Sequence, residues 1–221
     1  MIGFIKIKEK GEDISMLKNL VFDFGNVLVL CNSEVQMREC TSSEEEALSL
    51  HEAIWGDGLW RNTGLGLASS KDAIDHMCEQ HPEMADQIRT FLLKRSDAMR
   101  IPAETDACLR KLQKAGYNLY YISNTNDIDY DTIMKNHPIL HEFNGGLASH
   151  LVHLRKPDHR IFQLLLDRYG LKAEECLFVD DLEANTAAAA ELGYHPLTLT
   201  TGAATLETAL RTIPEISEQL G

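Results

Sequence analysis

Residues 19–30, "NLVFDFGNVLVL", decide the fold: a run of apolar residues is interrupted by a single acid, Asp23. Residues 17–22 end in three consecutive apolar positions, which is the pattern of a strand buried on both faces of a parallel sheet. Two positions after Asp23 stands Gly25 and not a second acid. The segment therefore predicts a buried strand that ends in a lone carboxylate.

Strand and helix patterns alternate along the second half of the chain. Strands are expected at 117–123, 145–150, 175–181 and 195–200, with helices at 102–116, 127–136, 157–170 and 182–193. This alternation predicts an α/β fold with a parallel sheet and helices on both faces. Ligands of such sheets bind at the carboxyl ends of the strands.

A purely helical segment separates the first strand from this alternation. Residues 42–55, 69–81 and 82–99 have helical spacing, and no strand pattern interrupts them. The predicted organisation is a core domain of residues 17–32 and 100–221, with a helical domain of residues 33–99 inserted in it. Residues 1–16 are predicted to form an N-terminal extension without ordered structure.

Composition narrows the class of protein. The 221 residues carry a net charge of −13, which disfavours binding to nucleic acid or to an anionic membrane surface. The five cysteines are widely spaced and form no CxxC pair, as is typical of a reducing compartment, so a cytoplasmic location is expected. No apolar run is long enough to span a bilayer. We expect a small-molecule partner and a monomer or homodimer.

Four of the expected strands deliver polar groups to one edge of the sheet. These groups are Asp23, then Ser123 with Asn124, then Lys156, and finally the pair Asp180 and Asp181. Three carboxylates in one pocket repel each other unless a cation shares them. Oxygen ligands without nearby histidine or cysteine favour Mg²⁺ over zinc, and Mg²⁺ favours phosphate oxygens. Asp23 would then lie beside a bound phosphoryl group, in position to attack phosphorus.

The segments "VFDFGNVLV", "YISNTN", "RKPD" and "FVDDLEAN", in this order, resemble the four motifs of the haloacid dehalogenase-like hydrolase superfamily. The helical insert resembles the alpha-helical cap of that family, and the resemblance extends from about residue 17 to 200. It implies a Rossmann-like core with an inserted cap. The "DxGN" form of the first motif is similar to a subgroup that contains glucose-1-phosphate phosphatase and the N-terminal domain of soluble epoxide hydrolase.

The resemblance implies a set of ligands for Mg²⁺. Asp23 matches the nucleophile, which is also a metal ligand, and Gly25 matches the position whose backbone carbonyl binds the metal. Asp181 matches the acid that ligates the metal directly, and Asp180 matches its neighbour in the outer part of the metal site.

The resemblance also implies groups that bind phosphate or substrate. These are Asn26, Ser123, Asn124 and Lys156 in the core. In the cap, Trp60 and Arg61 are expected to face the pocket and select the substrate, because a cap closes over the strand ends. Lys156 is further expected to steady the nucleophile. For Trp60 two interpretations stay open, because its indole would suit either the apolar core of the cap or a surface that faces the substrate.

Gly25 leaves the family's usual general acid and base unaccounted for. General acid–base catalysis contributes about 10²–10⁴-fold. One interpretation is a phosphatase acting on a good leaving group such as a sugar phosphate, with His153 as a possible substitute acid. The alternatives are a 2-haloacid dehalogenase, which needs no such acid but is disfavoured by the pair Asp180–Asp181, and a catalytically impaired phosphate-binding or regulatory protein.

Overall fold

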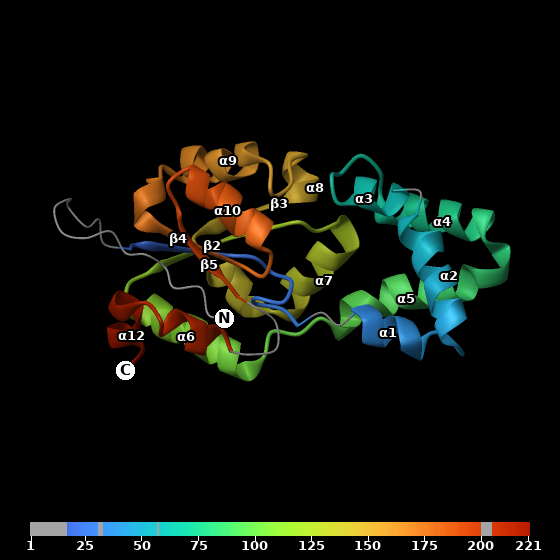
Figure 1. The fold of residues 1–221 in the computed structure, drawn as a ribbon, viewed down its shortest axis with the longest axis horizontal. Helices are drawn as coiled ribbons and strands as arrows, with labels where there is room; N and C mark the ends of the chain where they lie inside the picture. Colours follow the sequence, from blue (N-terminus) through green and yellow to red (C-terminus); the bar gives the residue numbers. More distant parts are fainter. Residues whose placement is uncertain (1–16, 31–32, 57, 200–204) are drawn as a thin grey trace.

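The structure is a computed structural model that describes residues 17–30, 33–56, 58–199 and 205–221. The predicted N-terminal extension therefore lies outside the described residues. The molecule has two parts, a sheet domain that contains both ends of the described chain and a helical domain beside it (Figure 1). Among the described residues, no helix combines the length and the apolarity that a bilayer crossing requires.

The sheet has five parallel strands in the order β3-β2-β1-β4-β5. The strands are β1 (Asn19–Phe22), β2 (Asn118–Ser123), β3 (Gly145–Ala148), β4 (Cys176–Asp180) and β5 (His195–Thr198). Phe22 pairs with Tyr121 of β2 and with Val179 of β4. This register brings the residue after β1, Asp23, to the same edge as the last residues of both neighbouring strands.

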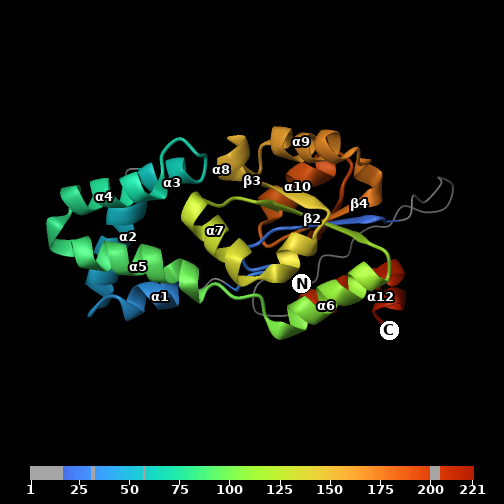
Figure 2. The ribbon, with the colours of Figure 1, turned by 180° about the vertical axis from the view of Figure 1, so that it is seen from behind.

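Helices cover both faces of the sheet, as the alternation predicts (Figures 1 and 2). The core-domain helices are α6 (Ala103–Lys114), α7 (Asp127–Asn136), α8 (Ser149–Val152), α9 (His159–Tyr169), α10 (Glu183–Glu191), α11 (Leu206–Leu210) and α12 (Pro214–Leu220), with short 3₁₀ turns at Pro138–Glu142 and Ala173–Glu175. In β1, Leu20 and Phe22 pack on the α6 side, while Val21 packs with α9 and α10. The strand is buried on both faces, which explains its continuous apolar run.

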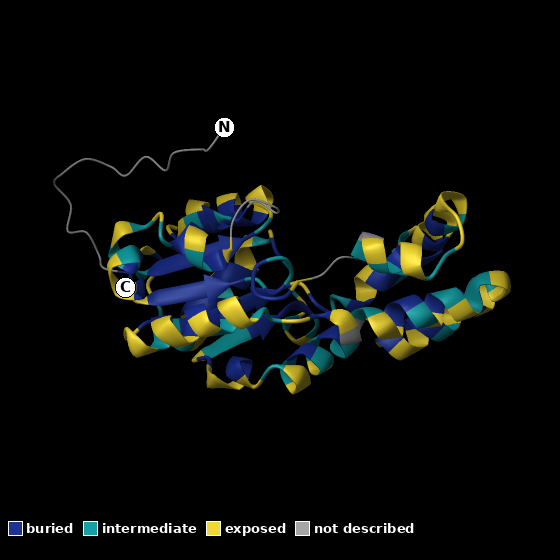
Figure 3. Cartoon of the chain, turned by 90° about the horizontal axis from the view of Figure 1, so that it is seen from below, coloured by how far each residue is buried: buried dark blue, intermediate teal, exposed yellow. Residues whose placement is uncertain are grey.

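The inserted domain is entirely helical within its described residues. It consists of α1 (Ser33–Glu39), α2 (Glu44–Trp55), α3 (Leu59–Thr63), α4 (Ser70–Gln80), a 3₁₀ turn (Pro82–Met84) and α5 (Ala85–Ala98). Its helices enclose an apolar cluster separate from the two clusters that flank the sheet, and their outer faces are exposed (Figure 3). We call this domain the cap. Serine side chains begin two of its helices: Ser43 accepts from the N–H of Glu46 at 3.1 Å, and Ser69 from that of Asp72 at 3.1 Å.

The chain enters and leaves the cap at one place. The N–H of Leu30 donates to the carbonyl of Arg100 at 2.9 Å, in an isolated antiparallel bridge. The strand predicted at 145–150 is shorter in the structure, because it ends at Ala148 and Ser149 begins α8. The prediction was wrong there because Ser149 turns its hydroxyl to the carbonyls of Gly64 and Thr125 instead of continuing the strand.

Candidate active site

A buried lysine joins two of the strand-end carboxylates. The Nζ of Lys156 lies 2.8 Å from Oδ1 of Asp23 and 2.7 Å from Oδ2 of Asp180. Lys156 is 2% exposed, so its ammonium has exchanged water for these two acids. A buried charge of this kind is tolerated only when it is paired and hydrogen-bonded. The predicted neighbourhood of Asp23 and Lys156 is therefore present in the structure.

Asn124 holds the backbone of Lys156. Its Nδ2 donates to the carbonyl of Lys156 at 2.9 Å, and the N–H of Lys156 donates to Oδ1 of Asn124 at 2.9 Å. Both polar atoms of the amide are used in this reciprocal pair. This pair of bonds fixes where the side chain of Lys156 begins, and the phosphate contact of Asn124 stays a prediction.

Asp180 is fully buried, and both of its oxygens are engaged. One oxygen accepts from Lys156, and the other accepts from the N–H of Leu182 and from Nδ2 of Asn185, each at 2.9 Å. These bonds orient the turn from β4 into α10. They leave Asp180 as a structural partner of Lys156 whose carboxylate also borders the predicted metal site.

Asp181 is oriented by Asn26. The Nδ2 of Asn26 donates to Oδ2 of Asp181 at 3.0 Å, across the gap between the loops after β1 and β4. Asn26 has a left-handed backbone with a φ of 56°, a conformation that asparagine tolerates better than most residues. Asn26 therefore contacts the acid expected to ligate the metal, and its role in phosphate binding stays a prediction.

The three acids fit a divalent cation. Asp23, Asp180 and Asp181 each offer an oxygen, and these atoms lie within 4.8 Å of one another. With the single positive charge of Lys156, the ionised cluster keeps two net negative charges, which one divalent cation neutralises. Hard carboxylate oxygens are ligands that Mg²⁺ accepts.

Asp23 has an unusual proton affinity in this setting. Burial raises the pKa of Asp23 to about 6, against the lowering effect of Lys156 and together with a smaller raising effect of Asp180. Its Oδ1 accepts from the N–H of Phe24 at 2.7 Å as well as from Lys156. A cation bound at the cluster would lower this pKa again by favouring the ionised form.

Ser123 and Gly25 lie at the same edge. Ser123 is the last residue of β2 and is 2% exposed. Gly25 is half-buried, and a Cβ placed on it would meet no atom within 4 Å. Packing around the Cβ position therefore does not require glycine here.

The two cap residues predicted to face the substrate differ in how far they are buried. Trp60 is 7% exposed and belongs to the apolar cluster inside the cap, so its burial supports the interpretation as cap core. Arg61, its neighbour in α3, is exposed. His153 is also exposed, and its Nδ1 bonds the carbonyl of Leu65 at 2.8 Å. This contact ties His153 to the cap and gives no sign of a catalytic role.

The segment after Ser123 also makes hydrogen bonds and an ion pair to the cap. The sequence pattern did not indicate these contacts. Asp127 accepts from the N–H and hydroxyl of Ser70, at the start of α4. Asp129 pairs with Arg95 of α5 at 2.5 Å, and both side chains are largely buried. Acids in the first turn of a helix are so common that these two carried no separate signal. The sequence offered one indication of their role, which is that both lie within six positions of Ser123, the serine predicted to bind phosphate.

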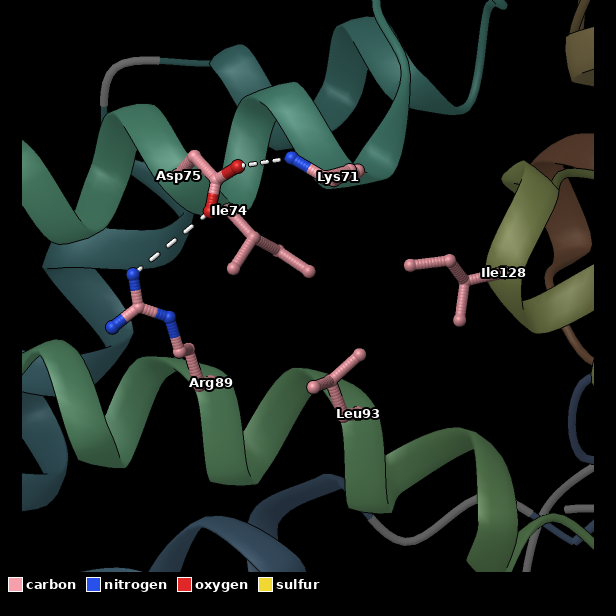
Figure 4. A pocket seen from close by; sticks show the side chains of 6 residues that line it. All are labelled: Lys71, Ile74, Asp75, Arg89, Leu93 and Ile128. Atoms are coloured by element: carbon pink, nitrogen blue, oxygen red, sulfur yellow. Dashed lines mark hydrogen bonds and ion pairs between the residues drawn. The ribbon is translucent and has the colours of Figure 1, made fainter.

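A shallow hollow lies between the cap and the core-domain helix α7, away from the predicted site residues. It lies between α4, α5 and the start of α7, where Ile74, Leu93 and Ile128 point toward one another (Figure 4). Asp75 beside it is paired with Lys71 at 2.6 Å and with Arg89 at 3.9 Å. None of the predicted site residues lines this hollow.

A family model for haloacid dehalogenase-like hydrolases matches residues 17–193. The chain belongs to this family. The match includes the cap and all four segments that carry the polar site residues. The chain is therefore a hydrolase of the haloacid dehalogenase-like family.

Relatives of this hydrolase include enzymes of two kinds. The sesquiterpene phosphatase astK of Aspergillus oryzae is 27% identical over 190 residues, which cover 85% of this chain and 92% of that protein. The (S)-2-haloacid dehalogenase 4A of Burkholderia cepacia is 25% identical over 199 residues, covering 82% of each. Phosphatases and dehalogenases thus both lie among its relatives.

A solved structure shows the same fold. A HAD family enzyme of Bacteroides thetaiotaomicron, in complex with magnesium and inorganic phosphate, superposes with a TM-score of 0.71 at 26% identity, covering 85% of this chain and 96% of that one. The predicted Rossmann-like α/β fold of this hydrolase is confirmed, with its five parallel strands and flanking helices.

Proposed function

We propose that this hydrolase is a Mg²⁺-dependent phosphatase that cleaves a small phosphomonoester through an aspartyl-phosphate on Asp23. The observation that carries the proposal is the cluster of three acids within 4.8 Å, balanced by only one lysine. Without a cation, such a cluster repels any anionic substrate, phosphate or carboxylate alike. A divalent cation removes that repulsion. The magnesium and phosphate complex of the Bacteroides enzyme adds support.

The chain's own residues define the first step. Oδ1 of Asp23 is held by Lys156 and by the N–H of Phe24, which leaves Oδ2 to attack phosphorus. The phosphorus–oxygen bond to the alcohol breaks as the bond to Oδ2 forms. Water then cleaves the aspartyl-phosphate and releases inorganic phosphate, which restores the carboxylate. Lys156 keeps its position throughout because its backbone is held by Asn124.

Asp23, Asp181 and the carbonyl of Gly25 are the groups that would hold Mg²⁺, with Asp180 behind them. The bound ion supplies positive charge against the phosphoryl oxygens. Ser123 is the group we assign to a phosphoryl oxygen, because it ends the strand beside β1.

Gly25 restricts the leaving group. It has no side chain to protonate the departing alcohol, so the best substrates are those whose alcohol leaves readily as an anion. A phosphate on the anomeric carbon of a sugar meets this condition better than a simple alkyl phosphate. We therefore propose a small phosphorylated metabolite, with sugar phosphates among the candidates, and a cytoplasmic monomer or homodimer. The described cysteines are free thiols, which fits a reducing compartment.

Phosphate and halide release measured side by side test the proposal. The enzyme is incubated with sugar phosphates, nucleotides and aryl phosphates, with Mg²⁺ or with EDTA, and separately with 2-haloacids. Phosphate release that needs Mg²⁺ is the expected result. Halide release that persists in EDTA would instead identify a dehalogenase, the activity of the Burkholderia relative. Phosphate binding without turnover of either kind would indicate a binding or regulatory protein.

A further inference from the structure

A single buried hydroxyl joins the cap to the core. Ser149, the first residue of α8, is fully buried. Its Oγ accepts from the backbone N–H of Thr125, in the loop after β2, at 3.0 Å. Two carbonyls lie within reach of its hydrogen, that of Gly64 in the cap at 2.5 Å and that of Thr125 in the core at 3.1 Å. The hydroxyl therefore has one acceptor in each domain.

A neighbouring histidine decides which carbonyl takes the hydrogen. A hydroxyl donates one hydrogen, so Ser149 bonds one of the two carbonyls at a time. The carbonyl of Thr125 already accepts from Nδ1 of His150 at 3.1 Å, and the carbonyl of Gly64 is the nearer acceptor. The hydrogen therefore belongs to Gly64 while the cap is in place. Thr125 offers a second acceptor, to which the hydroxyl turns when the cap moves away.

The cap is packed closely around this bond. A Cβ on Gly66 would lie 2.1 Å from the carbonyl oxygen of His150, and Nδ1 of His153 bonds the carbonyl of Leu65 at 2.8 Å. Figures 1 and 2 both place α3 next to α8. Because the hydroxyl is shielded from water, solvent does not replace a bond that it loses.

The same hydroxyl holds the loop that carries part of the site. We call residues 123–126, between β2 and α7, the β2 loop. It contains Ser123, which we assign to a phosphoryl oxygen, and Asn124, which holds the backbone of Lys156 through two bonds of 2.9 Å. Lys156 in turn contacts the nucleophile at 2.8 Å. A displacement of Thr125 therefore displaces both the phosphate group's expected partner and the anchor of the lysine.

The residues directly after the β2 loop are also attached to the cap. Asp127 accepts from the N–H and hydroxyl of Ser70, and Asp129 pairs with Arg95. Together with the bond through Ser149, these contacts make the position of the loop depend on the position of the cap.

We propose that Ser149 is a positioning residue that couples the seating of the cap to the geometry of the phosphoryl site. With the cap seated, its oxygen holds the N–H of Thr125 and its hydrogen holds Gly64, so one group fixes both the loop and the cap. When the cap moves away, the hydrogen turns to the carbonyl of Thr125, and no buried donor is left unpaired. This inference rests on the proposed phosphatase function, because the β2 loop is assigned to the phosphoryl group.

The kinetics of Ser149→Ala test the positioning. With Mg²⁺ and a phosphate ester, kcat should fall by about tenfold or more, because small misplacements of reacting groups slow the chemical step strongly. KM should change little, since Ser149 does not touch the substrate. Ser149→Cys keeps the size of the side chain and a weaker donor, so its kcat should lie between those of the wild type and Ser149→Ala.

Thr63→Val is the matched control. Thr63 is 1% exposed, and its hydroxyl donates to the carbonyl of Trp60 at 2.7 Å, within α3. The change removes a buried hydroxyl one residue from Gly64, but it removes no bond between the domains. It should lower the melting temperature, as Ser149→Ala does, and leave kcat unchanged.

Amide hydrogen exchange followed by NMR tests the coupling without turnover. In Ser149→Ala, exchange at the amide of Thr125 and at residues 64–67 of the cap should accelerate together, each by about five- to tenfold, which corresponds to the loss of one hydrogen bond. In Thr63→Val, exchange at the amide of Thr125 should stay as in the wild type, because its acceptor is still present.

Three results would overturn the inference. They are an unchanged kcat in folded Ser149→Ala, an equal loss of kcat in Thr63→Val, and faster exchange at Thr125 without any change at residues 64–67. If thermal melts show that Ser149→Ala is unfolded, Ser149→Cys carries the same comparisons.

Turnover by the wild type is scored separately. If the wild type hydrolyses no phosphomonoester while exchange at Thr125 and at residues 64–67 changes together, the proposed function fails and the link between cap and loop stands. If it hydrolyses phosphomonoesters and Ser149→Ala does so equally fast, the coupling fails and the phosphatase stands.

Discussion

Replacing Gly25 with aspartate should restore a general acid to this site. The structure admits the change, because a Cβ at Gly25 meets no atom within 4 Å and the backbone there is not left-handed. Since the new acid stands beside Asp23 and Asp181, like-charge repulsion raises its pKa and favours the protonated form that a leaving group needs. The loss of backbone freedom in the unfolded chain should change the free energy of unfolding by no more than about 1 kcal/mol.

The magnitude follows from the chemistry of the leaving group. General acid catalysis of about 10²–10⁴-fold corresponds to about 3–5 kcal/mol of activation free energy. An alkyl phosphate, whose alcohol must be protonated as it leaves, should gain at least about tenfold in kcat in Gly25→Asp. A p-nitrophenyl ester, whose leaving group departs as an anion, should gain little.

The assay is kcat across a series of phosphate esters graded by the acidity of the alcohol. The wild-type rate should fall steeply as the alcohol becomes less acidic, and Gly25→Asp should flatten this dependence. Gly25→Asn is the matched control, because it fills the same space without a proton to give. The reasoning is refuted if the asparagine variant gains as much, or if the wild-type dependence is already flat. The second result would mean that another group, such as His153, supplies the proton.

Three further changes probe the site and the cap. In metal-free protein, Asp23→Asn should raise the melting temperature near pH 8 and leave it unchanged near pH 4. The reason is that Asp23 has a pKa of about 6 in the folded protein, so the wild type loses stability as the pH rises from about 4 to 6. An equal shift of the melting temperature at both pH values would contradict this. Asn124→Ala should lower kcat by about tenfold or more through misplacement of Lys156; a kinetic series in which only KM changes would show that Asn124 contacts substrate instead. Asp129→Ala leaves Arg95 buried without its partner, so the free energy of unfolding measured in urea melts should fall by about 3 kcal/mol. A loss below about 1 kcal/mol would show that the ion pair is exposed to water.

The core of the site is predictable because it depends on topology. A parallel sheet places every strand's carboxyl end at one edge, so the residues that follow β1 and β4 must meet. The register of Phe22 opposite Val179 then fixes Asp23 beside Asp180. The continuous apolar pattern of the strands was sufficient to infer this without knowing any side-chain contact.

The hydrogen bonds of individual amides were not predictable. Asn124 follows a strand and precedes a helix, where its amide can bond phosphate, water or backbone with similar ease. Which partner it takes depends on Lys156, which is 32 positions away in the chain. The same holds for Asp129, whose partner Arg95 lies in another domain. Local patterns fix which groups are available, and tertiary packing fixes which ones pair.

The bridge between Leu30 and Arg100 implies that the cap is an insertion at a tight turn. Partners in an antiparallel bridge have Cα atoms about 5 Å apart, a span that a two-residue hairpin closes. Replacing residues 31–99 with such a turn would yield a miniature protein that retains every strand, the three acids and the lysine. That miniature would lack α3 and the residues after it, so the bonds from Ser149 to Gly64 and from His153 to Leu65 would be lost.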